Sequence, residues 1–219
     1  PIFYVTIGKV NVEARDIEAG IRKGVTEATK SIPLRANVVS PLTRENPGNN
    51  VGERMPFINY KLTSAPHVEI AVFPKGAGSE NMSALAMLNP SDGVRGVKSF
   101  VLGTVLSAGG KPCPPIVAGV GIGGSADIAM KIAKEALLRP LDERNRNEKI
   151  ASLEEELKTA LNETGMGPMG LGGRTTCLGV NIEQAYCHTA SLPVAVNIQC
   201  WAARKATARI DKKGKITYR

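Results

Sequence analysis

Apolar side chains recur along the chain with two different periods, and these periods divide it into strands and helices. In residues 67–76, Val68, Ile70 and Val72 alternate with other side chains, which predicts a strand. The segment 16–32 instead repeats its apolar residues at helical spacing, which predicts an amphipathic helix. The chain therefore mixes both kinds of element from its beginning.

Further elements follow from the same two patterns. Strands are predicted for residues 1–10, 115–121, 176–183 and 192–202. Helices are predicted for residues 82–88, 93–110, 125–138 and 148–165. The polar end of the chain, residues 209–219, predicts a final hairpin or a frayed terminus.

The order of these elements indicates the fold class. The segments KGAGSEN (75–81) and GIGGS (121–125) each join a strand to a helix through a glycine turn, and this repeated unit indicates an α/β protein. Residues 33–56 are rich in Pro, Asn and Gly without a period, which predicts a long loop or extended arm. Loops of that length are usually functional. No linker divides the chain, so we expect a single domain over residues 1–219 with mixed sheet regions.

Composition narrows the class of partner. A net charge of +8 suits either a polyanion or a small acid bound in a cationic pocket, and only 4% of the residues are aromatic. The few stacking platforms and the lack of a long Lys/Arg run favour the small acid over nucleic acid. No stretch is apolar enough to span a membrane, and no signal peptide is visible. Because the chain opens at Pro1 inside a strand, we take residue 1 as an artificial boundary.

The cysteines suggest thiol chemistry more than disulfides. Nothing indicates secretion, so we expect a cytoplasmic protein whose four cysteines are free thiols or metal ligands. Cys113 lies between Pro112 and Pro114, whose fixed backbone suits a metal ligand. A buried apolar cysteine is the equally weighted alternative. Cys200 ends an apolar run, where core packing is again the alternative.

Two further features are candidates for ligand binding. Exposed N–H groups at the glycine turns can bind an anion, although glycine also simply permits a tight turn. Neither turn matches a dinucleotide or phosphate-loop fingerprint, so a small carboxylate is a better candidate than a nucleotide. His188 lies in AYCHTASLP between two strands, where a hydrogen-bonded structural histidine is the alternative to a catalytic one.

Taken together, the segments of the chain resemble one family. The chain is similar to class I fumarate hydratases and the related tartrate dehydratases, in particular to their α subunit or N-terminal domain. The resemblance is carried in family order by PLRANVVSPLTRENPGNN, KGAGSENMSALAML, CPPIVAGVGIGGSAD, AKEALLRP, GMGPMGLGGRTTCLGVNIE and CHTASLPVAVNIQCWAAR. It covers nearly the whole chain.

The resemblance implies an iron–sulfur centre. Members of the family hold a 4Fe-4S cluster by three cysteines, and the remaining iron acts as a Lewis acid on the substrate. Cys113 resembles the second ligand and Cys200 the third. The first ligand belongs to a C-Q-D-T-G motif that would lie shortly before Pro1, together with an acid/base Asp. This sequence lacks both, and the resemblance gives neither Cys177 nor Cys187 a ligand role.

Other positions carry over by the same resemblance. Arg35 matches an arginine that grips a substrate carboxylate. Gly76, Ala77 and Gly78 match a turn whose N–H groups touch substrate, with alanine at a position that is commonly glycine. His188 matches a histidine near the substrate. The remaining catalytic groups are expected in a β subunit or C-terminal domain. The chain is therefore expected to be inactive without that partner and without the N-terminal segment that carries the first ligand.

The expected reaction is reversible hydration of fumarate to L-malate by a hetero-oligomeric enzyme. KGAGSEN and GIGGS look closer to the fumarate pattern than to the tartrate pattern. L-Tartrate dehydration to oxaloacetate is the first alternative. A non-enzymatic anion-binding or assembly module is the second, and a nucleotide-binding domain is disfavoured because the phosphate signatures are missing.

Overall fold

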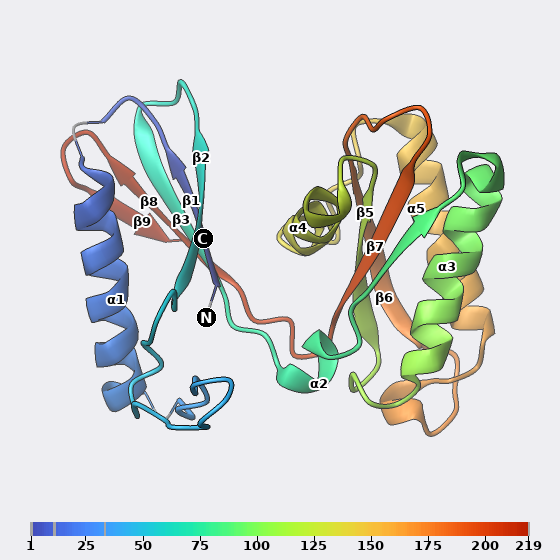
Figure 1. The fold of residues 1–219 in the computed structure, drawn as a ribbon, viewed down its shortest axis with the longest axis horizontal. Coiled ribbons are helices and arrows are strands. Elements are labelled where there is room, and N and C mark those ends of the chain that lie inside the picture. The colour runs from blue at the N-terminus through green and yellow to red at the C-terminus, as the bar shows by residue number, and fades with distance from the viewer. Residues whose placement is uncertain (1, 11, 33, 219) are drawn as a thin grey trace. The chain divides into compact units, whose positions relative to one another are not determined.

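The computed structural model describes residues 2–10, 12–32 and 34–218 and divides the chain into two compact units (Figure 1). Unit 1 comprises Pro1–Pro74 and Arg204–Arg219, and unit 2 comprises Lys75–Ala203. Each unit contains a mixed sheet and at least one helix, which confirms the α/β class. That residues 1–219 act as a single domain stays a prediction, and each unit is described here by itself.

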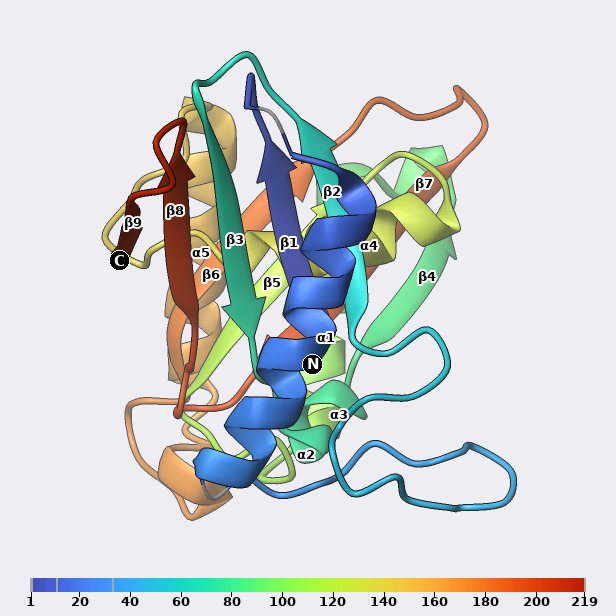
Figure 2. The same cartoon turned by 90° about the vertical axis from the view of Figure 1, so that its left-hand side faces the viewer.

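Unit 1 is a five-stranded sheet with one long helix against it (Figure 2). Its elements are β1 (Ile2–Ile7), α1 (Ala14–Ser31), β2 (Phe57–Leu62), β3 (His67–Phe73), β8 (Ala206–Asp211) and β9 (Ile216–Tyr218). The strand order is β2-β1-β3-β8-β9, with β1 and β2 parallel and the other neighbours antiparallel. The predicted helix and final hairpin are confirmed, whereas β2 was not anticipated from the sequence.

The helix α1 is held by its apolar stripe. Ile21 and Val25 pack on Val5 of β1 and Val68 of β3 and form the buried core of unit 1. These helical residues come from the same face because they lie four positions apart. Most of the polar side chains of α1 remain exposed, as the sequence pattern predicts.

The predicted loop is confirmed, and one buried side chain organises it. Residues 34–56 form neither helix nor strand. The side-chain oxygen of Asn50, Oδ1, accepts hydrogen bonds from the backbone N–H groups of Asn37 and Val38, at 2.8 and 3.3 Å. Its amide donates to Thr29 Oγ1 and to the carbonyl oxygen of Arg35, at 3.1 and 3.2 Å. Asn50 therefore fixes the backbone on which Arg35 is carried.

Unit 2 is a four-stranded sheet with helices on both faces (Figure 1). Its strand order is β4-β7-β5-β6, with β5 and β6 parallel and the other neighbours antiparallel. The strands are β4 (Ala84–Leu88), β5 (Ile116–Ile122), β6 (Cys177–Gln184) and β7 (Leu192–Gln199). The α-helices are α2 (Ala77–Glu80), α3 (Gly93–Ala108), α4 (Ala126–Ala136) and α5 (Glu148–Glu163), and short 3-10 turns occur at Pro90–Asp92 and Pro168–Gly170.

The two faces of this sheet are packed differently. One face forms the main core, in which valines of α3 and leucines of α5 meet Ile116, Ala118 and Val120 of β5. On the other face α4 lies close to the strand through small residues. A Cβ atom on Gly121 would lie 2.0 Å from the carbonyl oxygen of Ala129, so only glycine permits this approach. The glycines of the VAGVGI strand therefore set the distance between β5 and α4.

One predicted element is wrong. Residues 82–88 were expected to form a helix, but the structure places strand β4 there, paired antiparallel with β7. A run this short gains little from intrinsic helix formation. The ladder to β7 satisfies its backbone instead, and tertiary pairing overrides local propensity. None of the helices in the described part of the chain is long and apolar enough to cross a membrane.

Candidate functional site

Cys113 and Cys200 come together at one end of the two central strands of unit 2, where β5 begins and β7 ends. The register pairs Val117 of β5 with Gln199 of β7, so the segment before β5 lies beside the residue after β7. The Trp201 N–H donates a hydrogen bond to the carbonyl oxygen of Cys113 at 3.3 Å. We call the end of the sheet that carries Cys113 and Cys200 the cysteine edge.

The backbone at Cys113 is strained in a way that presents the thiol. Its φ is +57°, a left-handed value that costs a non-glycine residue about 1–3 kcal/mol. Its N–H donates to the carbonyl oxygen of Gly110 at 3.0 Å. Pro112 and Pro114 are buried on either side while Cys113 is exposed. Two buried prolines thus anchor a thiol that remains accessible.

A glycine-rich loop, residues 165–175, packs against the segment that carries Cys113. The sequence pattern did not assign this role to the loop. The Met169 N–H donates to the carbonyl oxygen of Pro114 at 2.9 Å. A Cβ atom on Gly170 would lie 2.8 Å from the Gly110 Cα, so the two glycine backbones touch. The high glycine density of the loop was the signal in the sequence, but its contact with the Cys113 segment was not visible there.

The first glycine turn also reaches the cysteine edge. A Cβ atom on Gly78 would lie 3.1 Å from the carbonyl oxygen of Lys111, which places the turn beside the Cys113 segment. Gly76, Ala77 and Gly78 are all exposed. The predicted substrate-binding turn and the predicted metal ligands are therefore neighbours in space.

An ion triplet fixes this turn to α4. The Glu80 carboxylate lies 2.8 Å from Lys75 Nζ and 2.6 Å from Lys134 Nζ. Burial alone would raise the pKa of the Glu80 carboxyl, but hydrogen bonds from Lys134 and Lys75 outweigh it and lower that pKa. Burial lowers the pKa of Lys75, whose side chain is 7% exposed, because Glu80 offsets only part of the cost of desolvation.

His188 lies at the opposite edge of the sheet. It belongs to the loop between β6 and β7, and its Nδ1 accepts a hydrogen bond from the Ala190 N–H at 3.1 Å. The whole of β7 separates it from Cys200, a span of roughly 25 Å at about 3.3 Å per residue. The second glycine turn is at that edge too, where the Gly123 N–H donates to the carbonyl oxygen of Pro193 at 2.8 Å. Unit 2 does not bring His188 to the cysteines, and its role stays a prediction.

Arg35 belongs to unit 1 and lies in the loop that Asn50 organises. Its side chain is exposed, and its guanidinium makes no hydrogen bond or ion pair within the described part of the chain. The group is therefore available for a ligand carboxylate. Its predicted role also stays a prediction.

The other two cysteines do not join the cysteine edge as ligands. All four cysteines are free thiols, as expected. Cys177 is buried in the main core, where desolvation raises the pKa of its thiol to about 12. Cys187 is exposed in the loop of His188, where its thiol lies 3.2 Å from the carbonyl oxygen of Ser191. The structure thus places these two cysteines apart from Cys113 and Cys200, whose ligand roles stay a prediction.

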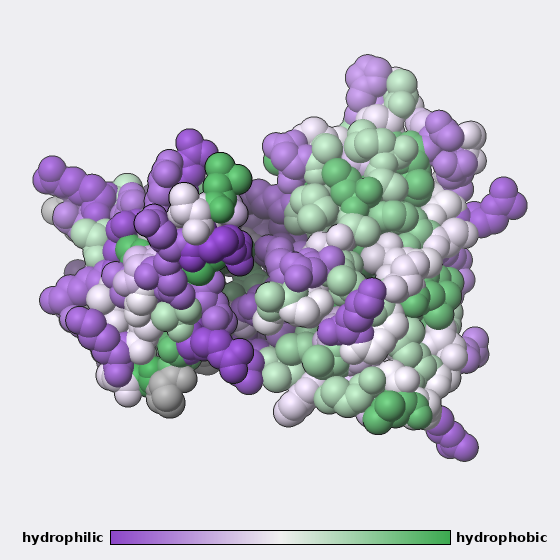
Figure 3. Space-filling view, turned by 60° about the horizontal axis from the view of Figure 1, so that its bottom comes forward, coloured by the Kyte–Doolittle hydropathy of each residue, from purple (hydrophilic) through white to green (hydrophobic). Residues whose placement is uncertain are grey.

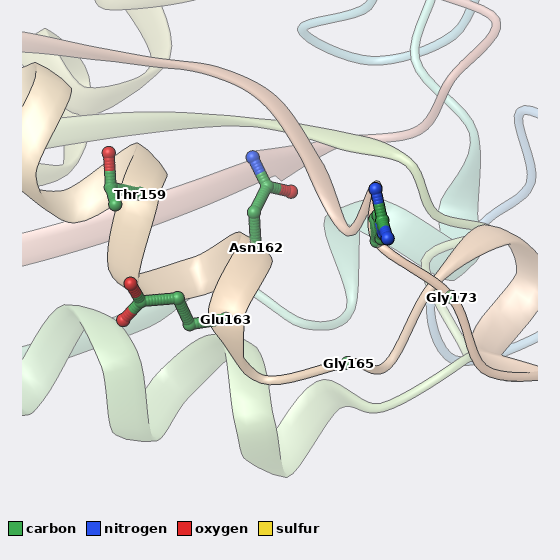
Figure 4. A pocket seen from close by; sticks show the side chains of 6 residues that line it. Thr159, Asn162, Glu163, Gly165 and Gly173 are labelled. Atoms are coloured by element: carbon green, nitrogen blue, oxygen red, sulfur yellow. The ribbon is translucent and has the colours of Figure 1, made fainter.

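A separate pocket of about 650 Å³ lies where α5 meets the glycine-rich loop (Figure 4). The pocket is lined by Thr159, Asn162 and Glu163 of the helix and by Gly165 and Gly173 of the loop. The Asn162 amide oxygen already accepts hydrogen bonds from the N–H groups of Thr176 and Cys177, at 2.8 and 2.9 Å. This amide therefore holds the loop in place and is not free to recognise a ligand.

The cysteine edge fits part of a metal site. Within the described residues no group of three or more His, Cys, Asp or Glu side chains is placed to hold a metal ion. Two cysteines on neighbouring backbone segments nevertheless supply the soft donors that iron–sulfur clusters use. The donors present thus fit two of the ligands of such a cluster, and a third has to come from outside this set.

An α/β unit that brings two free cysteines together beside an exposed glycine turn is typical of a metallo-enzyme, and this is the class of protein that the fold and the site indicate. A family model described as fumarate hydratase (Fumerase) matches residues 1–209. A putative L(+)-tartrate dehydratase subunit alpha from Methanocaldococcus jannaschii is 56% identical, covering 99% of this chain and 77% of that protein. The L(+)-tartrate dehydratase subunit alpha of Escherichia coli K12 is 35% identical, covering 94% of this chain and 68% of that protein.

The chain therefore belongs to the fumarate hydratase family, which confirms the resemblance found in the sequence. Membership makes it a chain of the hydro-lyase kind. The relatives' designation as α subunits points to a further subunit in those enzymes.

Replacing Gly170 by alanine tests how the glycine-rich loop supports Cys113. Gly170 and Gly172 both have left-handed backbones, so replacing either of them by alanine lowers the free energy of unfolding by about 1–2 kcal/mol. Only Gly170→Ala also drives a Cβ to 2.8 Å from the Gly110 Cα, whereas nothing lies within 4 Å of a Cβ at Gly172. We expect Gly170→Ala to change the rate of maleimide labelling at Cys113 several-fold, measured by mass spectrometry, and Gly172→Ala to leave it unchanged. Equal rates in both variants would show that the contact does not position the cysteine.

Proposed function

We propose that this chain is the α-type part of an iron–sulfur hydro-lyase that adds water to, or removes it from, a four-carbon dicarboxylate. The observation that carries the proposal is the meeting of Cys113 and Cys200 at one exposed sheet edge, beside the glycine turn of residues 76–78. Residues far apart in the sequence gather there, and their types match a site that holds a metal cluster and an anion.

Each of these residues has a definite task in the proposed mechanism. The thiolates of Cys113 and Cys200 hold a 4Fe-4S cluster, which when bound supplies Lewis-acid activation of the substrate hydroxyl and carboxylate. The backbone N–H groups of Gly76, Ala77 and Gly78 orient one carboxylate. The guanidinium of Arg35 grips a carboxylate with two parallel hydrogen bonds. The basic character of the chain attracts a dianionic substrate.

The proposed enzyme needs a partner. Two cysteines leave the cluster one ligand short, and the general acid and base are not among the residues at the cysteine edge. Unit 2 exposes large apolar side chains on its edge strand and beside it, with Leu85 at 40%, Met87 at 57% and Val94 at 59% exposure. Figure 3 shows apolar patches of this kind on the surface of unit 2. Such patches suit a β subunit or C-terminal domain.

Iron binding tests the proposal. The protein is produced from its full gene together with its partner, without oxygen, and its iron content and visible absorption are measured. We expect about four irons per chain, with the iron lost or depleted in Cys113→Ser and Cys200→Ser. The matched control Cys187→Ser replaces an exposed thiol at the other edge and should keep the iron. A wild type that binds no iron after reconstitution with iron and sulfide would favour the anion-binding or assembly module instead.

The substrate has two candidates, which an activity assay separates. The glycine-turn motifs favour fumarate and malate, whereas the names of the relatives favour L-tartrate. With whichever substrate turns over, Arg35→Met should raise KM about tenfold or more, because a hydrogen-bonded charge pair is lost. Arg44→Met, another exposed arginine of the same loop, is the matched control. An unchanged KM in Arg35→Met would remove Arg35 from the substrate site.

A further inference from the structure

Unmet hydrogen-bonding groups gather beside the cysteine edge. Four buried side-chain nitrogen and oxygen atoms in the described part of the chain have no partner with hydrogen-bond geometry, although two of them lie in ion pairs. One is Nε of Arg139, which lies away from the cysteines and 3.5 Å from a carboxylate oxygen of Glu183. The other three are Lys75 Nζ, Asn197 Oδ1 and Gln199 Oε1. Buried polar groups are normally satisfied, so such a cluster indicates that something else completes it.

These three residues lie around the end of β7. Gln199 is 2% exposed and directly precedes Cys200. Asn197 is fully buried on the same face of the strand, and its amide donates to Ser83 Oγ at 2.7 Å. Lys75 leads into α2, and α2 packs against β7. The unmet groups therefore lie near the end of β7, next to the position that we assign to a metal ligand.

Of the three residues, Lys75 has the most hydrogen-bond donors without an acceptor. An ammonium group has three hydrogens to donate, and Glu80 accounts for one direction at 2.8 Å. The rest have no acceptor within the described residues, although the side chain is 7% exposed. Leaving a buried charged donor unmet is more costly than leaving a neutral one. The group is also not free to leave, because Glu80 is itself held by Lys134 at 2.6 Å.

We propose that Lys75 is a positioning residue of the cluster, whose ammonium donates a hydrogen bond to sulfur at Cys200 while Glu80 and Lys134 hold it in place. The inference rests on the proposed function, since it requires a cluster at the cysteine edge. Sulfur carries negative charge in a cluster, so it is the acceptor that the ammonium lacks. Hydrogen bonds and nearby charge at the sulfurs set the reduction potential of iron–sulfur clusters. Lys75 therefore stabilises the reduced, more negative form.

The test compares Lys75→Met, Lys75→Arg and Lys98→Met in the full protein with its partner, handled without oxygen. Lys98→Met is the matched control, because Lys98 is ion-paired with Glu156 away from the cysteines. The readouts are iron per chain and the midpoint potential of the cluster in a titration followed by electron paramagnetic resonance. We expect Lys75→Met to keep its iron. Its reduced-to-oxidised ratio at a fixed potential should shift about tenfold toward the oxidised cluster, which lowers the midpoint potential by about 59 mV for one electron. Lys75→Arg should lie close to the wild type and Lys98→Met should match it.

The outcomes separate the two ideas. A wild type that holds iron, with the same potential in Lys75→Met, overturns the role of Lys75 and leaves the proposed function standing. A wild type without iron overturns both. A second measurement needs no variant: in wild-type protein carrying ¹⁵N-lysine, pulsed electron paramagnetic resonance of the reduced cluster should detect a lysine nitrogen coupling. Its absence overturns the inference even where Lys75→Met does not fold.

Discussion

The antiparallel pairing of β5 with β7 is the constraint on which the site depends. Its register sets Val117 opposite Gln199, and only this register brings Cys113 beside Cys200 across a large separation in sequence. A slip of one residue would turn every side chain of β7 to the other face of the sheet. The tight approach of α4 at Gly121 and the packed core on the opposite face both hold this register.

Stability gained in the core is offset at the cysteine edge. The left-handed backbone of Cys113, the buried charge of Lys75 and the unpartnered side-chain oxygen of Gln199 each cost free energy. Such costs cluster where a protein holds chemically useful groups in fixed positions. The glycine-rich loop and the Glu80 ion triplet keep these groups in place, so the edge is rigid without being covered.

The sequence predicted most of the elements and the chemistry, but not their contacts. Periodicity located α1, α3, α4, α5 and the buried strands, because these have long or clear apolar patterns. It failed for β4, whose identity comes from pairing with β7 and not from its own residues. The resemblance selected Cys113 and Cys200 over Cys177. No local pattern revealed that His188 lies at the far end of the sheet or that the Lys75 side chain is buried, because both depend on contacts between segments that are distant in the sequence.

X-ray absorption at the iron edge, on the anaerobically purified complex, tests the central claim that the two cysteines hold one cluster. The account predicts sulfur neighbours around iron and the short iron–iron vector of a cluster, with both signals lost when Cys113 and Cys200 are replaced together. Iron surrounded only by nitrogen and oxygen, or a cluster signal that survives the double replacement, would contradict it.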